Sequence, residues 1–124
     1  MLALEKAKLC LRIIGERKAI EPVLLEVGEL SSITDYFLIA SGNSSRQVQA
    51  ITQHLLRRTR EKGFRPYGVE GEREGHWVLL DYGDVVIHLF YQAVREFYDL
   101  EGLWIEAPRV SLENDNLKIV EVSK

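Results

Sequence analysis

Residues 77–91 constrain the fold more than any other part of the chain. Two apolar runs, Trp77 to Tyr82 and Val85 to Tyr91, are separated only by Gly83 and Asp84. A two-residue connection between such runs is typical of a tight β-hairpin. If Tyr82 pairs with Val85, the register of the whole strand pair is fixed, because side chains alternate between the two faces.

This register divides the hairpin into two chemically different faces. The first is almost wholly apolar and is expected to pack against helices; it holds Val78, Leu80, Tyr82, Val85, Ile87 and Leu89. The second mixes large apolar groups with an acid and an imidazole; it holds Trp77, Leu79, Asp81, Val86, His88 and Phe90. A core would not bury the acid and the imidazole without partners, and a solvent face would not need three large apolar side chains. The second face is therefore predicted to bind a protein partner, unless a terminal helix or a second subunit covers it.

Helices are predicted in three places. Apolar residues recur at helical spacing over residues 2–17, and again from about residue 45 to Lys62, where Gly63 is a suitable C-terminal cap. A last helical segment spans residues 93–104, with a break at Gly102, and ends before Pro108.

Besides the hairpin, strands are predicted at residues 22–27, 37–40 and, more weakly, 66–70. The unbroken apolar run at 37–40 is typical of a central strand that is covered on both faces. The element order predicts an α/β fold: a single domain, residues 1–110, with a mixed five-stranded sheet flanked by helices. Residues 111–124 are predicted to be a tail or an added edge strand.

Composition limits the partners. The chain has 124 residues and a net charge of −3, from 16 basic against 19 acidic residues. A protein held to nucleic acid mainly by phosphate contacts usually has a basic excess, so a protein partner, in particular a basic one, is favoured. No targeting or membrane-spanning segment is recognised, which predicts a cytoplasmic protein without membrane contact. The single cysteine, Cys10, excludes an intrachain disulfide and is expected to be a small buried hydrophobe.

Catalytic and metal-binding patterns are weak. The turn from Ser41 to Ser45 could bind an anion at the following helix, or simply cap that helix. It loosely resembles the Gly-Ser turn of nucleotidyltransferases, which also need two acids in a D-x-D spacing to hold metal ions. No such pair follows it, and His54, His76 and His88 have no metal-ligand spacing, so no cofactor is predicted. A nucleotidyltransferase-like enzyme stays the alternative to a binding protein.

The helix after this turn is locally basic. It carries Arg46, Arg57, Arg58 and Arg60, which form either a solvated face or a contact with an RNA backbone. His54 lies in the middle of this helix and is expected to be solvated, whereas His88 is expected to be a hydrogen-bonded sheet residue.

Three segments carry a family signature. They are residues 35–44, 75–88 and 95–104, which read DYFLIASGNS, GHWVLLDYGDVVIH and REFYDLEGLW. Their order and spacing resemble the Iojap family of ribosomal silencing factors over about residues 1–108.

This resemblance implies a non-enzymatic repressor of translation with a nucleotidyltransferase-like core that lacks the catalytic acids. Such a factor binds the large ribosomal subunit through its protein numbered fourteen, blocks joining with the small subunit and damps translation under nutrient limitation. The resemblance also implies a homodimer when the protein is free, and it leaves room for a minor contact with ribosomal RNA. The residues mapped to partner binding, without separating ribosome from dimer contacts, are His76, Trp77, Leu79, Asp81, Tyr82, Asp84, His88, Arg95, Tyr98 and Asp99.

Overall fold

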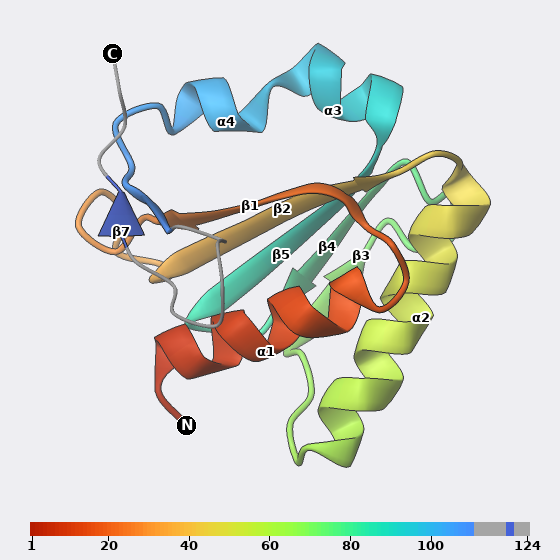
Figure 1. Ribbon diagram of the computed structural model, residues 1–124, viewed down its shortest axis with the longest axis horizontal. Helices are drawn as coiled ribbons and strands as arrows, with labels where there is room; N and C mark the ends of the chain where they lie inside the picture. The colour runs from red at the N-terminus through yellow and green to blue at the C-terminus, as the bar shows by residue number, and fades with distance from the viewer. Residues whose placement is uncertain (111–118, 121–124) are drawn as a thin grey trace.

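The structure, a computed structural model, describes residues 1–110 and the backbone of residues 119–120 (Figure 1). Its elements are α1 (Ala3–Gly15), β1 (Ile20–Glu26), β2 (Tyr36–Gly42), α2 (Ser45–Glu61), β3 (Gly68–Glu70), β4 (Trp77–Asp81), β5 (Val85–Tyr91), α3 (Gln92–Tyr98), α4 (Leu100–Leu103), β6 (Arg109–Val110) and β7 (Ile119–Val120).

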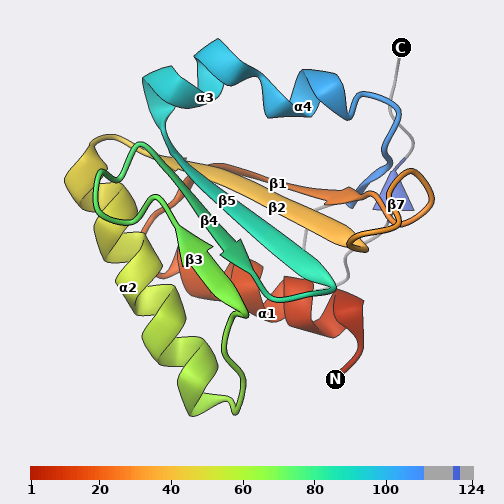
Figure 2. The same ribbon diagram turned by 180° about the vertical axis from the view of Figure 1, so that it is seen from behind.

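One mixed sheet organises the domain. Its strand order is β3-β4-β5-β2-β1-β6-β7, with β2 and β5 parallel and the other pairs antiparallel (Figure 2). The α/β class is confirmed, and each of the five expected strands is present. The sheet is wider than expected because two-residue strands, β6 and β7, extend one edge. A strand of two residues is too short to show the alternation of apolar and polar side chains by which strands are recognised in a sequence. β7 lies within residues 111–124, and the rest of that segment falls outside the described residues.

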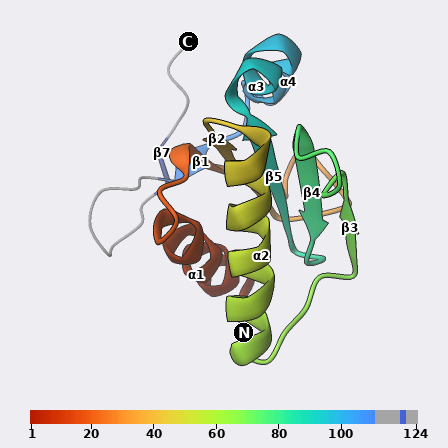
Figure 3. The same ribbon diagram turned by 90° about the vertical axis from the view of Figure 1, so that its right-hand side faces the viewer.

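Helices cover both faces of the sheet. α1 and α2 lie on one face, and α3 and α4 lie on the other (Figure 3). The larger core fills the first interface, where Cys10 and Ile14 of α1 meet Leu55 of α2 and the inner side chains of the strands. A smaller core lies under α3 and α4 and includes Ile39 and Phe90. In the described part of the chain, no helix has the length and apolar character needed to cross a membrane.

The predicted hairpin register is confirmed. Trp77 lies opposite Phe90, Leu79 opposite His88, and the amide of Tyr82 donates to the carbonyl of Val85 over 2.9 Å. The six residues of the first hairpin face are all buried in the larger core. The second face therefore points toward α3 and α4.

The ends of the helices follow local signals, with one exception. Ser44 caps α2 by accepting a hydrogen bond from the amide of Gln47 at 3.1 Å, so the turn from Ser41 to Ser45 does cap the helix. The last helical segment breaks at Asp99, and the expected break at Gly102 is wrong. Asp99 adopts a left-handed backbone with φ of 46°, and its carboxylate accepts from the amide of Gly102 at 3.2 Å. This side-chain cap starts a new helical turn one residue after the old one ends.

Candidate functional site

The second hairpin face is only partly covered. α3 and α4 bury Phe90 completely, so terminal helices do cover one end of this face. Trp77, Leu79 and Asp81 stay partly exposed toward the β3 edge of the sheet. The face thus combines a packed end with an open end.

The open end forms a groove of about 490 Å³. Its floor is the sheet, and its sides are Trp104, which follows α4, and the loop between β1 and β2. Three of the predicted binding residues line it: Leu79, Asp81 and His88. Val86, which the sequence also places on the second hairpin face, lines it as well. The other lining residues, which are not among the predicted binding residues, are Leu30, Ser31, Ser32, Ile33, Thr34, Phe37 and Trp104.

Trp77 and His88 are joined directly. The indole Nε1–H of Trp77 donates to Nδ1 of His88 over 3.1 Å, which confirms His88 as a hydrogen-bonded sheet residue. Because Nδ1 accepts, the ring proton of neutral His88 sits on Nε2. Burial lowers the pKa of His88 to about 4, since desolvation disfavours the charged imidazolium. His88 is therefore neutral at pH 7.

Tyr98 and Asp99 complete the outer part of the face. The Tyr98 ring packs against the Trp77 ring at 5.0 Å between centroids, and Tyr98 is 52% exposed. Asp99 is exposed at the junction of α3 and α4. His76 is exposed just before β4, and its carbonyl accepts from the amide of Tyr91 over 2.9 Å. The structure therefore brings His76, Trp77 and Tyr98 to one end of the face.

Tyr82 and Asp84, which the sequence also predicts to bind the partner, lie away from the groove. Tyr82 points into the larger core, where its hydroxyl lies 2.9 Å from Oγ1 of Thr59, and burial raises its pKa to about 12. Asp84 lies in the hairpin turn and forms a 2.7 Å ion pair with Lys6 of α1. Neither side chain reaches the groove.

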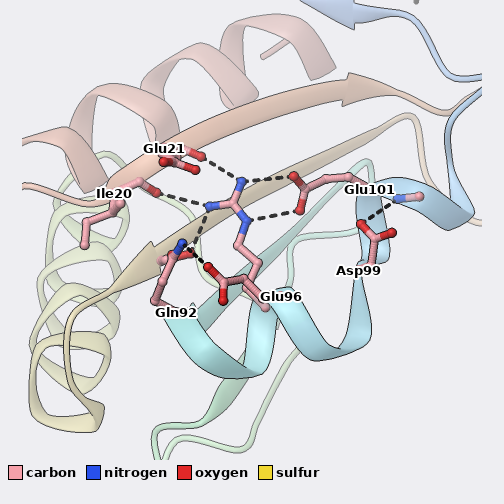
Figure 4. Close-up of polar contacts among 9 residues, drawn as sticks. Ile20, Glu21, Gln92, Glu96, Asp99 and Glu101 are labelled. Atoms are coloured by element: carbon pink, nitrogen blue, oxygen red, sulfur yellow. Dashed lines mark hydrogen bonds and ion pairs between the residues drawn. The ribbon is translucent and has the colours of Figure 1, made fainter. Parts of the chain in front are cut away.

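Arg95 is an internal anchor. Its side chain is 5% exposed and reaches from α3 to two strands and to α4, where Ile20, Glu21 and Glu101 are among its partners (Figure 4). Its guanidinium donates to the carbonyls of Ile20 and Glu21 at 3.2 and 2.8 Å and to Oγ of Ser41 at 2.9 Å. The Glu101 carboxylate accepts the remaining bonds at 3.0 and 3.3 Å, so every N–H of the guanidinium has an acceptor. Arg95 thus fixes α3 and α4 against the sheet and so positions Tyr98 and Asp99.

The charged loop before β4 is also fixed. Gly71 has a positive φ of 82°, and a Cβ at this position would lie 2.1 Å from the carbonyl oxygen of Trp77. The side-chain amide of Gln49 in α2 donates to the carbonyls of Glu72 and Arg73 at 3.2 and 2.9 Å. These contacts hold the chain where it enters β4 and therefore set the position of Trp77.

The expectation that His54 is solvated is wrong. α1 packs against α2, so His54 is buried, and its Nε2 lies 2.8 Å from Oε1 of Glu16. Arg58 forms an ion pair with the same carboxylate. The hydrogen bond from His54, followed by that from Arg58, lowers the pKa of Glu16. Arg46 and Arg60 stay exposed on α2.

The acids of this region are not arranged as a metal site. Asp81 accepts a hydrogen bond from the amide of Gly83 at 2.8 Å, and Asp84 is paired with Lys6. Over residues 1–110, no group of three or more His, Cys, Asp or Glu side chains could hold a metal ion.

Comparison with known proteins decides the family. The model of the family described as "Ribosomal silencing factor during starvation" matches residues 2–123. The chain belongs to this family. The ribosomal silencing factor of Halalkalibacterium halodurans is 42% identical over 109 residues, covering 88% of this chain and 93% of that protein. The resemblance stated from the three sequence segments is thereby confirmed.

Solved structures and a more distant relative agree with this family. A crystal structure of a protein from Chromobacterium violaceum superposes with a TM-score of 0.81 at 36% identity, covering 84% of this chain and 87% of that one. A mouse protein named "Mitochondrial assembly of ribosomal large subunit protein 1" is 34% identical over 95 residues, covering 74% of this chain and 42% of its own length. The chain thus shares its fold with the solved Chromobacterium violaceum structure, and part of the mouse protein is similar to it in sequence.

Proposed function

We propose that this protein represses translation by binding the large ribosomal subunit through its protein numbered fourteen, which sterically blocks joining with the small subunit. Membership of the ribosomal silencing factor family supports a role on the ribosome, and the family's description connects this role to starvation. The name of the mouse relative, which refers to assembly of the large subunit, favours that subunit. The proposed mechanism requires occupancy of a surface and no catalysis.

The observation that carries this proposal is the incompletely covered hairpin face. Aromatic residues and arginine are enriched where protein interfaces hold their binding energy, and Trp77 and Tyr98 stand side by side here. Large apolar side chains are also exposed on the elements of this side of the sheet: Ile33 of the β1–β2 loop is 85% exposed, and Phe97 and Leu103 of the terminal helices are 81% and 77% exposed. An exposed apolar surface of this kind marks an interaction site.

Charge favours a basic protein as the partner. Between residues 69 and 110, nine acidic residues stand against three arginines. This stretch includes β4, β5, α3 and α4, which build the face. The direct contacts in this proposal are His76, Trp77, Leu79, Asp81, His88, Tyr98 and Asp99. Tyr82, Asp84 and Arg95 act from within the fold by holding those residues in place.

The proposal has three further parts: a contact with RNA, a dimer and a location in the cell. Arg46 and Arg60 on α2 are exposed cations that could meet ribosomal RNA phosphates, as a minor contact that adds to the protein interface. In the free protein, a second copy would cover the exposed apolar face and give a homodimer. We place the protein in the cytoplasm, where ribosomes assemble from their subunits.

Sedimentation with purified subunits tests the proposal. The protein should sediment with large subunits and not with small ones, and added protein should lower the yield of joined ribosomes. Equal binding to both subunits, or to neither, would contradict it. The alternative, a nucleotidyltransferase-like enzyme, requires that nucleotide with magnesium raise the melting temperature; we expect no shift.

A further inference from the structure

Two polar atoms at the groove have no hydrogen-bond partner among the described residues. They are Oγ1 of Thr34 and Nε2 of His88. Both residues line the groove, and they are only 6% and 5% exposed. Buried polar atoms are nearly always paired in folded proteins, because an unpaired one has lost its hydrogen bonds to water without replacement. Both atoms belong to residues that line one groove, where a bound group can supply their partners.

The chemistry of these atoms defines that group. His88 offers a donor, because Trp77 occupies Nδ1 and the proton of the neutral ring lies on Nε2. The hydroxyl of Thr34 can donate or accept. The ligand must therefore present an acceptor to His88, which a purely cationic group does not have.

The surroundings exclude an anionic acceptor. Asp81 is the charged side chain among the lining residues, and neither lysine nor arginine lines the described groove. A carboxylate or phosphate would meet a like charge and would find no cation. A neutral carbonyl is the acceptor that fits. Phe37, Leu79 and Val86 on the floor and Trp104 at the side would contact an apolar side chain next to it.

The groove also continues into a wider apolar rim. Leu30 and Ile33 line it and are 53% and 85% exposed, so their outer surfaces extend beyond the cavity. A polypeptide would cover both the groove and this rim, whereas a small molecule would fill the groove alone.

We propose that the groove receives an apolar side chain of the protein partner, and that His88 Nε2–H and the Thr34 hydroxyl bind backbone carbonyl groups beside that side chain. This inference rests on the proposed function and names the chemistry of the same face. The unpaired atoms destabilise the free protein and are satisfied only in the complex. Stability and affinity should therefore respond in opposite directions when one of them is removed.

Thr34→Val tests this directly, because valine has the shape of threonine without the hydroxyl. We expect the melting temperature to rise by roughly 2–5 °C and the affinity for purified large subunits to fall by about five- to tenfold. Thr52→Val is the matched control: Thr52 is buried on the other side of the sheet, and its hydroxyl already donates to the carbonyl of Val48 at 2.8 Å. It should lower the melting temperature and leave affinity unchanged.

His88→Asn provides a second variant. The asparagine oxygen can replace Nδ1 as acceptor for Trp77, while the donor at Nε2 is lost, so affinity should again fall by about five- to tenfold. Wild-type affinity in both Thr34→Val and His88→Asn would overturn the inference and leave the proposed function intact. A lower melting temperature in Thr34→Val would overturn it as well, because the hydroxyl would then be paired in the free protein. A wild-type chain that does not bind large subunits would overturn the proposed function and, with it, this inference.

Discussion

Trp77 and His88 lie on neighbouring strands, and the 3.1 Å hydrogen bond from the indole to the imidazole fixes the orientation of both rings. The pair is diagonal, because Trp77 lies opposite Phe90 and His88 lies opposite Leu79. It connects the packed end of the face, under α3 and α4, to the groove. The indole is therefore already part of the fold before any partner arrives.

Protonation of His88 should make the protein less stable in acid. Its pKa is lowered to about 4 in the folded state and is about 6.5 in the unfolded chain, so the unfolded state binds more protons between these values. The free energy of unfolding should therefore fall as pH decreases from 6.5 to 4, by up to about 1.4 kcal/mol per pH unit from this group. Urea unfolding of the wild type and His88→Asn at several pH values measures the difference in slope. Identical slopes would contradict the prediction.

Trp77 should contribute to both stability and binding. The sequence predicts a partner-binding face for Trp77, and on an uncovered face Trp77→Ala would keep most of its stability. The ring instead packs against Phe90 at 4.9 Å and Tyr98 at 5.0 Å. We expect Trp77→Ala to lower the free energy of unfolding by about 2–4 kcal/mol and the affinity for large subunits by about thirtyfold or more.

Trp77→Phe separates these two effects. It keeps an aromatic ring on Phe90 and loses the hydrogen bond to His88 and part of the indole packing, so stability should fall by about 1–2 kcal/mol. Denaturant unfolding and sedimentation with large subunits measure both quantities. Wild-type subunit binding by a folded Trp77→Ala protein would remove Trp77 from the proposed interface.

Arg95 should be required for stability rather than for direct contact. Arg95→Met leaves the carboxylate of Glu101 and the carbonyls of Ile20 and Glu21 without their donor, and we expect a loss of about 3–5 kcal/mol. Arg60→Met is the control, since Arg60 is exposed on α2, and it should change stability by less than about 0.5 kcal/mol. Denaturant unfolding gives both values. Hydrogen exchange should show faster exchange in α3 and α4 of Arg95→Met, and an unchanged profile would argue against the anchoring role.

Cys10 should be inert in the native protein. The side chain is fully buried, and burial raises the pKa of its thiol to about 12, so about one thiol in ten thousand is ionised at pH 8. Labelling with iodoacetamide should be very slow in the folded protein and rapid in denaturant. Rapid labelling under native conditions would show that α1 separates from the sheet.

Short-range patterns were sufficient for much of the fold. The two-residue turn at Gly83 and Asp84 predicted the register of the hairpin, because alternation along two adjacent strands leaves one pairing that buries the apolar face. The cap at Ser44 and the central position of residues 37–40 likewise follow from local sequence. The break at Asp99 is not predicted by the sequence. It depends on the hydrogen bond from the amide of Gly102 to the carboxylate of Asp99, and the presence of Gly102 in the sequence does not reveal this bond.

The candidate site was harder to predict because it depends on contacts between distant segments. Thr34 belongs to the groove only because the loop after β1 folds beside β5 and Trp104. Arg95 was expected among the binding residues. Its burial follows from the bulge in β1 between Ile20 and Val23, where two successive carbonyls face the guanidinium. No pattern in residues 95–104 alone shows where those carbonyls will be.

β4 and β5 each carry the main core on one side and the groove on the other. The backbone amides of these strands can exchange with solvent only when the sheet around them opens, which exposes the core as well. Amide protection in the groove should therefore approach that of global unfolding. For a partner, this means that the strands forming the floor of the groove are ordered before contact, and association loses little conformational entropy there.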